Sequence, residues 1–291
     1  MKSRRYLVLV GFAAALLSLA ASAPAAFGAD RLPDLRMAAI DDIRLDRTTL
    51  PDRKLLRFTT VIVNVGAGPL ELHGSRPDTA TPEMAVTQRI FDSNGGTRDV
   101  ATNATMFFAG DGHNHWHTKN LESSDLVRLD SSAQVAAYAK QGFCFADNRS
   151  FAPSLPGAPS SFVYGTCGHD PNQLTTTMGL SVGWGDPYHW TTAFQWIDIT
   201  GVPSGRYRLF VTADAAGWFE ETDQTNNATW ADIVLGPKGV DVVGYGPAAM
   251  PDAAVAALWV SGAIPPVSGD HFDDGSKQPK AKKHPKAKAK H

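Results

Sequence analysis

Several features that define other protein classes are missing from this chain of 291 residues. It has only two cysteines and no Cys-x-x-Cys pair, which gives little support to a thiol-based metal site. After the first 29 residues, no apolar run approaches the roughly 20 residues needed to cross a bilayer. No internal repeat is present, and residues 30–236 contain no long amphipathic helical pattern. These absences argue against a membrane-spanning body, a repeat protein and a helical bundle.

The first 29 residues have the pattern of a secretory signal peptide. Three basic residues are followed by an apolar run and then by small residues as far as Ala29. The alternative is a membrane anchor, for which the apolar run is short. We expect cleavage between Ala23 and Ala29 and a secreted or extracellular mature protein. In that oxidising setting Cys144 and Cys167 are expected to form one disulfide, which closes a loop of about 22 residues and stabilises the fold by about 3 kcal/mol.

The formal net charge of −2 conceals two regions of opposite sign. Seven lysines lie in the last 15 residues and three basic residues lie in the predicted signal, which leaves 17 basic residues against 29 acidic ones. An acidic body is suited to basic substrates and disfavours nucleic acid. Residues 275–291 are too polar to form a core, so we expect a disordered Lys-rich tail, and an anionic cell-wall polymer is a candidate partner for it.

The spacing of apolar residues predicts an all-β fold. Short apolar runs alternate with Gly, Pro, Asn and Asp, and Ser93-Asn94-Gly95-Gly96 is a hairpin signal. The clearest predicted strands are 56–65, 86–91, 194–199, 206–212 and 230–235. We therefore expect an antiparallel β-sandwich-type catalytic domain over residues 30–236, with few short helices. Residues 237–274 form a predicted C-terminal extension, in which Asp252–Val260 is expected to be a short helix.

The segment Asp111-Gly112-His113-Asn114-His115-Trp116-His117 has three histidines at alternate positions. If the segment is extended, the three imidazoles point to the same side, because side chains alternate with a period of two. Three converging imidazoles make a metal site with open positions, suited to copper, zinc, iron or nickel. The alternative is a polar strand with solvated histidines.

Two other segments become informative only together. Lys140 stands in Lys-Gln-Gly-Phe-Cys-Phe-Ala-Asp, and Tyr188 stands in Gly-Trp-Gly-Asp-Pro-Tyr-His-Trp, before Gln-Trp-Ile-Asp-Ile-Thr. Each residue alone has an ordinary interpretation, as a surface lysine and a packing aromatic.

A third cluster contains the oxygen-bearing residues Glu221, Asp223, Asn226 and Asn227. Such a turn suits calcium, and the alternative is an Asx-rich turn held by its own hydrogen bonds.

These segments together resemble the lysyl oxidase family over about residues 32–235. The resemblance implies that His113, His115 and His117 bind copper, and that Lys140 and Tyr188 are the precursors of lysine tyrosylquinone. Cys144 and Cys167 match family cysteines, and Asp34 and Leu35 match a pair that completes a calcium site. The residues Trp184 and Gly185 differ from the vertebrate pattern, which leaves the choice of substrate open.

The implied activity is oxidative deamination of primary amines, in particular peptidyl lysine. The products are an aldehyde, ammonia and hydrogen peroxide, molecular oxygen is the oxidant, and Asp186 is a candidate for the base. Neither nucleic acid nor a membrane span is expected. One alternative is a non-catalytic secreted β-sandwich that binds metal at the cell wall. Another is a zinc hydrolase, although no acid/base Glu stands in a recognisable motif near the histidines.

Overall fold

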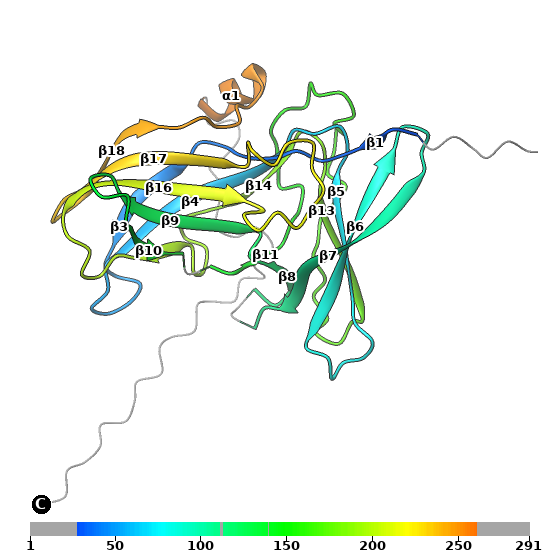
Figure 1. Cartoon of the computed structure of the whole chain (residues 1–291), viewed down its shortest axis with the longest axis horizontal. Helices are drawn as coiled ribbons and strands as arrows, with labels where there is room; N and C mark the ends of the chain where they lie inside the picture. Colours follow the sequence, from blue (N-terminus) through cyan, green and yellow to red (C-terminus); the bar gives the residue numbers. More distant parts are fainter. Residues whose placement is uncertain (1–27, 111–112, 139, 261–291) are drawn as a thin grey trace, which may run out of the picture.

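Three antiparallel sheets make up the part of the chain that the computed structural model describes, residues 28–110, 113–138 and 140–260. The seven-stranded sheet, with a long twisted hairpin of β6 and β7, lies at one end of the molecule (Figure 1). Its order is β11-β8-β7-β6-β5-β13, with β1 paired to β6. Its strands are β1 (Asp30–Arg31), β5 (Leu70–Ser75), β6 (Glu83–Asp92), β7 (Thr97–Phe108), β8 (Trp116–Lys119), β11 (Gly142–Phe143) and β13 (Thr175–Leu180).

The other two sheets lie at the opposite end, where their strands run along the length of the molecule (Figure 1). The five-stranded sheet has the order β10-β9-β16-β17-β18, with β9 (Glu122–Arg128), β10 (Gln134–Ala137), β16 (Gly205–Ala213), β17 (Ala228–Leu235) and β18 (Val240–Tyr245). The six-stranded sheet has the order β12-β14-β4-β15, with β2 and β3 also paired to β4. Its strands are β2 (Leu35–Met37), β3 (Asp41–Asp46), β4 (Leu55–Asn64), β12 (Arg149–Ser150), β14 (Trp184–Tyr188) and β15 (Trp196–Asp198).

The sequence patterns explain where the core forms. All ten residues of β4 are buried, as expected for a strand that is apolar or β-branched along nearly its whole length. In β16 the buried residues alternate with more exposed ones, and Tyr207, Leu209 and Val211 enter the core from one face. The predicted all-β class is confirmed, and each predicted strand overlaps an observed one.

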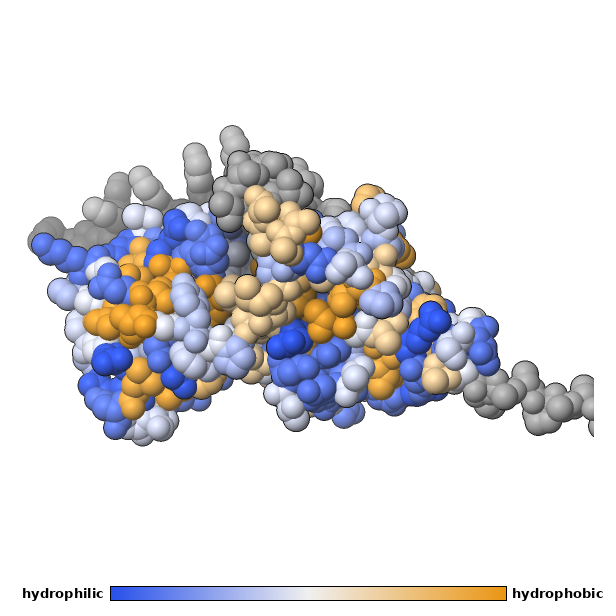
Figure 2. Space-filling view, turned by 90° about the horizontal axis from the view of Figure 1, so that it is seen from above, coloured by the Kyte–Doolittle hydropathy of each residue, from blue (hydrophilic) through white to orange (hydrophobic). Residues whose placement is uncertain are grey.

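The C-terminal part of the described chain adds to the body. Strand β18 pairs with β17, and the single helix found in the described residues, α1 (Ala253–Val260), matches the predicted helix within one residue. Figure 2 shows hydrophobic atoms interspersed with polar ones on the face carrying β18 and α1. The predicted signal peptide and the Lys-rich tail lie outside the described residues. Within them, no helix has the length and apolar character needed to cross a bilayer.

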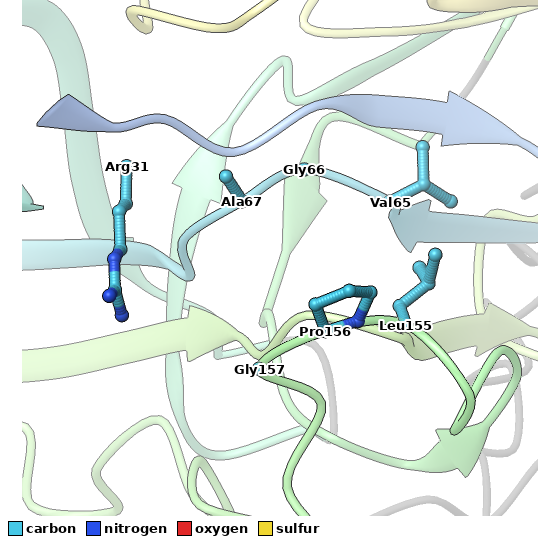
Figure 3. Close-up of a pocket in the computed structure, with 7 residues that line it drawn as sticks. All are labelled: Arg31, Val65, Gly66, Ala67, Leu155, Pro156 and Gly157. Carbon is cyan, nitrogen blue, oxygen red and sulfur yellow. The ribbon is translucent and has the colours of Figure 1, made fainter. Parts of the chain in front are cut away.

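A hollow of about 470 Å³ lies between the β4–β5 connection and the segment after Phe151 (Figure 3). It is lined by Arg31, Val65, Gly66, Ala67, Leu155, Pro156 and Gly157. These residues include no carboxylate, histidine, cysteine or tyrosine. The hollow therefore lacks the groups that acid–base or metal chemistry requires, and the candidate site lies elsewhere.

The β4–β5 connection is packed directly against the N-terminal segment. Asn64 organises it, since its Nδ2 donates to the carbonyls of Gly68 and Leu180 while its Oδ1 accepts from the Asp34 and Gly66 amides. A Cβ atom on Gly68 would lie 2.0 Å from the carbonyl oxygen of Arg31. Only glycine fits at this close approach of two backbones.

We predict that Gly68→Ala lowers the free energy of unfolding by about 1–3 kcal/mol, because the methyl group meets backbone atoms that cannot rotate away. Thermal or urea unfolding followed by circular dichroism measures this change. Gly239→Ala is the matched control, since a Cβ there meets no atom within 4 Å. Equal stability of the two variants would contradict the packing argument.

Candidate metal and cofactor site

The three histidines of the His-x-His-x-His segment converge, although not on one regular strand. His117 belongs to β8, whereas His113 and His115 lie in the preceding turn and bend. The segment is not extended along its whole length, because Asn114 has a left-handed backbone with φ of 52°. The Nε2 atoms of His115 and His117 nevertheless face each other at 2.7 Å, and one nitrogen from each of the three rings lies within 4.8 Å of the others.

The loop after Cys167 holds this segment in place. The backbone amide of Trp116 donates to the carbonyls of Cys167 and Gly168, and its indole nitrogen donates to the carbonyl of Asp170. The ring of His169 packs edge-on against His115, with centroids 5.7 Å apart. The predicted disulfide between Cys144 and Cys167 is present. The position of the histidines therefore depends on contacts with a loop about 50 residues further along the chain.

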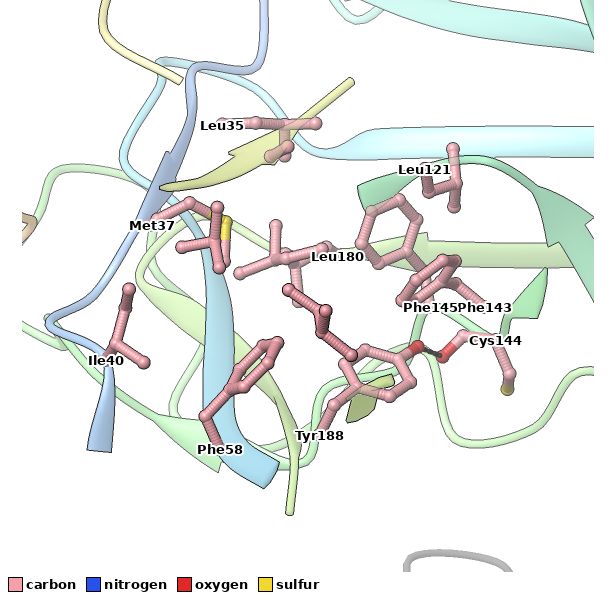
Figure 4. Close-up of a cluster of buried hydrophobic side chains, with 14 of the residues drawn as sticks. Leu35, Met37, Ile40, Phe58, Leu121, Phe143, Cys144, Phe145, Leu180 and Tyr188 are labelled. Carbon is pink, nitrogen blue, oxygen red and sulfur yellow. Dashed lines mark hydrogen bonds between the residues drawn. The ribbon is translucent and has the colours of Figure 1, made fainter. Parts of the chain in front are cut away.

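Lys140 and Tyr188 come together in the core. The Lys140 Nζ atom lies 5.2 Å from the centre of the Tyr188 ring and 5.4 Å from that of Phe143, and both Lys140 and Tyr188 are over 90 % buried. Tyr188 ends β14, and its hydroxyl donates to the Cys144 carbonyl at 2.9 Å, as Figure 4 shows. The two residues that the sequence singled out, 48 positions apart, are thus placed side by side.

The segment of Lys140 also lies against that of the histidines. Gly142 and Phe143 form β11, which pairs with β8 next to His117. A Cβ on Gly142 would lie 2.6 Å from the Nδ1 atom of His117, so glycine is needed for this approach. Burial lowers the pKa of His117 well below its usual range, and the nearby positive charge of Lys140 lowers it further. A neutral imidazole is the form that binds a metal.

Two buried carboxyl groups stand beside the lysine–tyrosine pair. Asp186 lies two residues before Tyr188 on β14 and accepts a hydrogen bond from Asn148 at 2.5 Å. Burial raises its pKa to about 8. Burial and the charge of Asp186 in turn raise the pKa of Tyr188 well above its usual range. Burial also raises the pKa of Glu122 to about 7, against the opposing effects of the Thr60 hydrogen bond and the positive charge of Lys140.

Comparison with known proteins agrees with this geometry. The model of the family described as lysyl oxidase matches residues 84–244, more than half of the chain. The chain belongs to the lysyl oxidase family. It is 34% identical to the human protein-lysine 6-oxidase over 123 residues, 42% of this chain and 26% of that protein. It is 35% identical to the pig protein-lysine 6-oxidase over 124 residues, 42% of this chain and 44% of that protein. The chain thus matches less than half the length of these relatives.

A lysyl oxidase site is expected to hold copper, and the donor set here fits that metal. Three imidazoles, each over 90 % buried, converge, and a metal ion held by three donors would have further positions for other ligands. His113, His115 and His117 would hold the ion. Imidazole also suits zinc and nickel, so the choice of copper rests on the family rather than on the donor set alone.

The oxygen-bearing cluster of this chain is assembled around the start of β2. Glu221 accepts hydrogen bonds from the Leu35 amide and from Asn227 Nδ2. Asn226 donates to Asp223 at 3.3 Å, and Asp223 also accepts a hydrogen bond from the Thr225 amide. Three buried oxygens receive no hydrogen bond from the described residues: Asp34 Oδ1, Asn226 Oδ1 and Asn227 Oδ1. Buried oxygens of this kind are suitable ligands for a hard cation.

Sequence reasoning did not single out Glu122. It stands alone in a strand without a motif, and only the pairing of distant strands places it near Lys140 and Tyr188. The sequence signal that was available is weak: Glu122 occupies an alternating position whose other members, Ser124 and Leu126, are buried.

We predict that His115→Ala lowers copper affinity by more than about a hundredfold, because loss of a residue that only hydrogen-bonds to a metal ligand already costs typically 10–100-fold. Isothermal titration with copper, together with elemental analysis, measures this loss. His73→Ala is the control, since His73 pairs with Glu71 and takes no part in the cluster. Near-normal copper content in His115→Ala would count against the site.

Proposed function

We propose that this chain is a copper-dependent amine oxidase that oxidatively deaminates primary amines, in particular peptidyl lysine. The products are an aldehyde, ammonia and hydrogen peroxide, with molecular oxygen as the oxidant. One observation carries the proposal: the Nζ atom of Lys140 lies 5.2 Å from the Tyr188 ring, and β11, which begins two residues after Lys140, pairs with the strand that carries His117. The relatives named protein-lysine 6-oxidase support peptidyl lysine as the substrate class.

The residues of the chain have separate tasks in this proposal. The three histidines hold copper, which supplies the oxidation of Tyr188 by oxygen. Lys140 is held beside the ring to which its nitrogen must become linked, so that the two side chains form lysine tyrosylquinone. Burial of both side chains excludes water and keeps competing nucleophiles away from the ring. Because the fold already holds the two side chains together, residues that are distant in the sequence can react as neighbouring groups.

Asp186 is the candidate base for removal of the proton next to the substrate nitrogen. Its carboxyl is buried beside Tyr188, and burial raises its pKa to about 8, so near neutral pH it can both take up and release a proton. The protein is proposed to act outside the cell. Binding of an anionic wall polymer by the Lys-rich tail remains a prediction from the sequence.

We predict that copper-loaded protein contains a covalent link between Lys140 and Tyr188, and that Lys140→Arg abolishes it while copper remains bound. Peptide mapping by mass spectrometry detects the link, and a visible absorption band that responds to phenylhydrazine reports the quinone. Lys119→Arg is a matched control, because Lys119 pairs with Glu83 at the protein surface. If active protein has Lys140 and Tyr188 only in unmodified form, the cofactor assignment fails. The non-catalytic metal-binding alternative predicts copper without the absorption band.

We further propose that Asp34, the Leu35 carbonyl, Glu221, Asp223, Asn226 and Asn227 bind calcium as a structural ion. The three buried oxygens without a hydrogen-bond donor support this proposal. So does the burial of Glu221, which raises its pKa to about 8, because a cation would stabilise the ionised carboxylate there.

We predict that calcium raises the melting temperature of metal-free protein without altering the visible spectrum. A ligand present at 100 times its Kd stabilises the folded state by about 2.7 kcal/mol. Differential scanning calorimetry with and without calcium measures the effect. Asp34→Asn should remove most of it, whereas Asp78→Asn, in an exposed turn, should not. An unchanged melting curve in calcium would favour the Asx-rich turn.

A further inference from the structure

One buried carboxyl beside the lysine–tyrosine pair has no task in the proposed function. Glu122 is the first residue of β9, and only 2 % of its surface is exposed. Its Oε2 atom accepts a hydrogen bond from the Thr60 hydroxyl at 2.8 Å. The phenol of Tyr138 also hydrogen-bonds to this carboxyl and lowers its pKa against the effect of burial. Burying a carboxyl group this deeply is costly, so its position needs an explanation.

The hydrogen bonds around Glu122 join the strand opposite Tyr188 to the segment just before Lys140 in the sequence. Thr60 lies directly opposite Tyr188 in the pairing of β4 with β14. Gln195 donates to the Thr60 hydroxyl at 3.3 Å and accepts a hydrogen bond from the Tyr138 hydroxyl. Tyr138 is two residues before Lys140. The network therefore begins opposite Tyr188 and ends at a residue close to Lys140 in the sequence, and it holds Glu122 in place between these two segments.

Lys140 has a chemical requirement that this arrangement can meet. An ammonium group has no lone pair, so its nitrogen cannot form a bond to the ring until it has lost a proton. The positive charge of Lys140 acts on His117, Asp186 and Glu122. His117 is assigned to the metal, and Asp186 lies against the hydroxyl of Tyr188. Glu122 is a proton acceptor to which the proposed function assigns no other task.

We propose that Glu122 accepts the proton of Lys140 when the link between Lys140 and Tyr188 forms, and that Thr60, Gln195 and Tyr138 position it for this step. This inference rests on the proposed function. The ionised carboxylate takes one proton from the ammonium group, which leaves a neutral carboxyl and a neutral amine. No electrons are transferred in the step, and the lone pair released on the nitrogen becomes available for bonding to carbon.

The electrostatics of this buried site suit the transfer. Burial raises the pKa of Glu122 to about 7, so the carboxyl can be ionised before the transfer and neutral after it. A neutral carboxyl and a neutral amine are also less costly to bury than the two separate charges. The proton transfer therefore fits a site in which both groups are buried away from water.

The test follows formation of the link in full-length protein prepared without copper. Copper and oxygen are then added, and peptide mapping over time quantifies unmodified Tyr188, Tyr188 that has gained oxygen, and Tyr188 joined to Lys140. In Glu122→Gln we expect normal copper binding and linking at least about tenfold slower than in the unsubstituted protein, with accumulation of oxygenated Tyr188 beside unmodified Lys140. Asp214→Asn, another buried carboxyl, is the control and should link at the normal rate.

Two further variants separate a proton acceptor from a structural residue. Glu122→Asp keeps the carboxyl and should link faster than Glu122→Gln, and it replaces that variant if the latter does not fold. Formate should accelerate linking in Glu122→Ala, while formamide should not. Linking at the normal rate in Glu122→Gln, or no rescue by formate in a folded Glu122→Ala, would overturn the inference. Absence of the link in the unsubstituted protein would instead overturn the proposed function.

Discussion

Strand pairing along β4 is the interaction on which the rest of the site depends. All ten of its residues are buried, and its edges receive β2, β3, β14 and β15. Its pairing with β14 puts Thr60 opposite Tyr188, and its last residue, Asn64, anchors the amides of Asp34 and Gly66. The pairing register of such a strand is strongly specified, because a slip of one residue would move every side chain to the opposite face of the sheet.

Strand β4 also carries a buried charged residue, Arg57, which contacts the end of β3 and the segment after Tyr188. Arg57 pairs with Asp46 at 2.8 Å and donates to the backbone carbonyl of Trp190, just after Tyr188. A buried ion pair adds little net stability, but loss of one partner leaves an uncompensated charge. Its contribution is therefore better described as positioning, since it fixes the chain on the C-terminal side of the tyrosine. Lys140, Glu122 and Asp186 are likewise buried polar groups whose value lies in their arrangement.

The parts of this structure that were predictable from the sequence are those encoded locally. Turn residues and period-two alternation gave strands such as β16, and the three-histidine segment indicated a metal site. The conformation of that segment was not predictable, because Asn114 adopts a left-handed backbone under the contacts of a distant loop. Glu122 was missed for a related reason: its partner Thr60 is 62 residues away, and only the folding of separate sheets brings them together.

The disulfide joins the segment that carries the metal ligands to Tyr188. It does so through backbone hydrogen bonds of its two cysteines as well as through the bond between their sulfurs. The carbonyl of Cys167 accepts a hydrogen bond from Trp116, between His115 and His117, while the carbonyl of Cys144 accepts the hydroxyl of Tyr188. One covalent bond therefore fixes the segment that carries the metal ligands relative to the phenol proposed to be oxidised. A bond of this kind limits how far the two can separate when the core fluctuates. With only two cysteines in the chain, the one bridge is located where the geometry of the proposed chemistry is most sensitive to displacement.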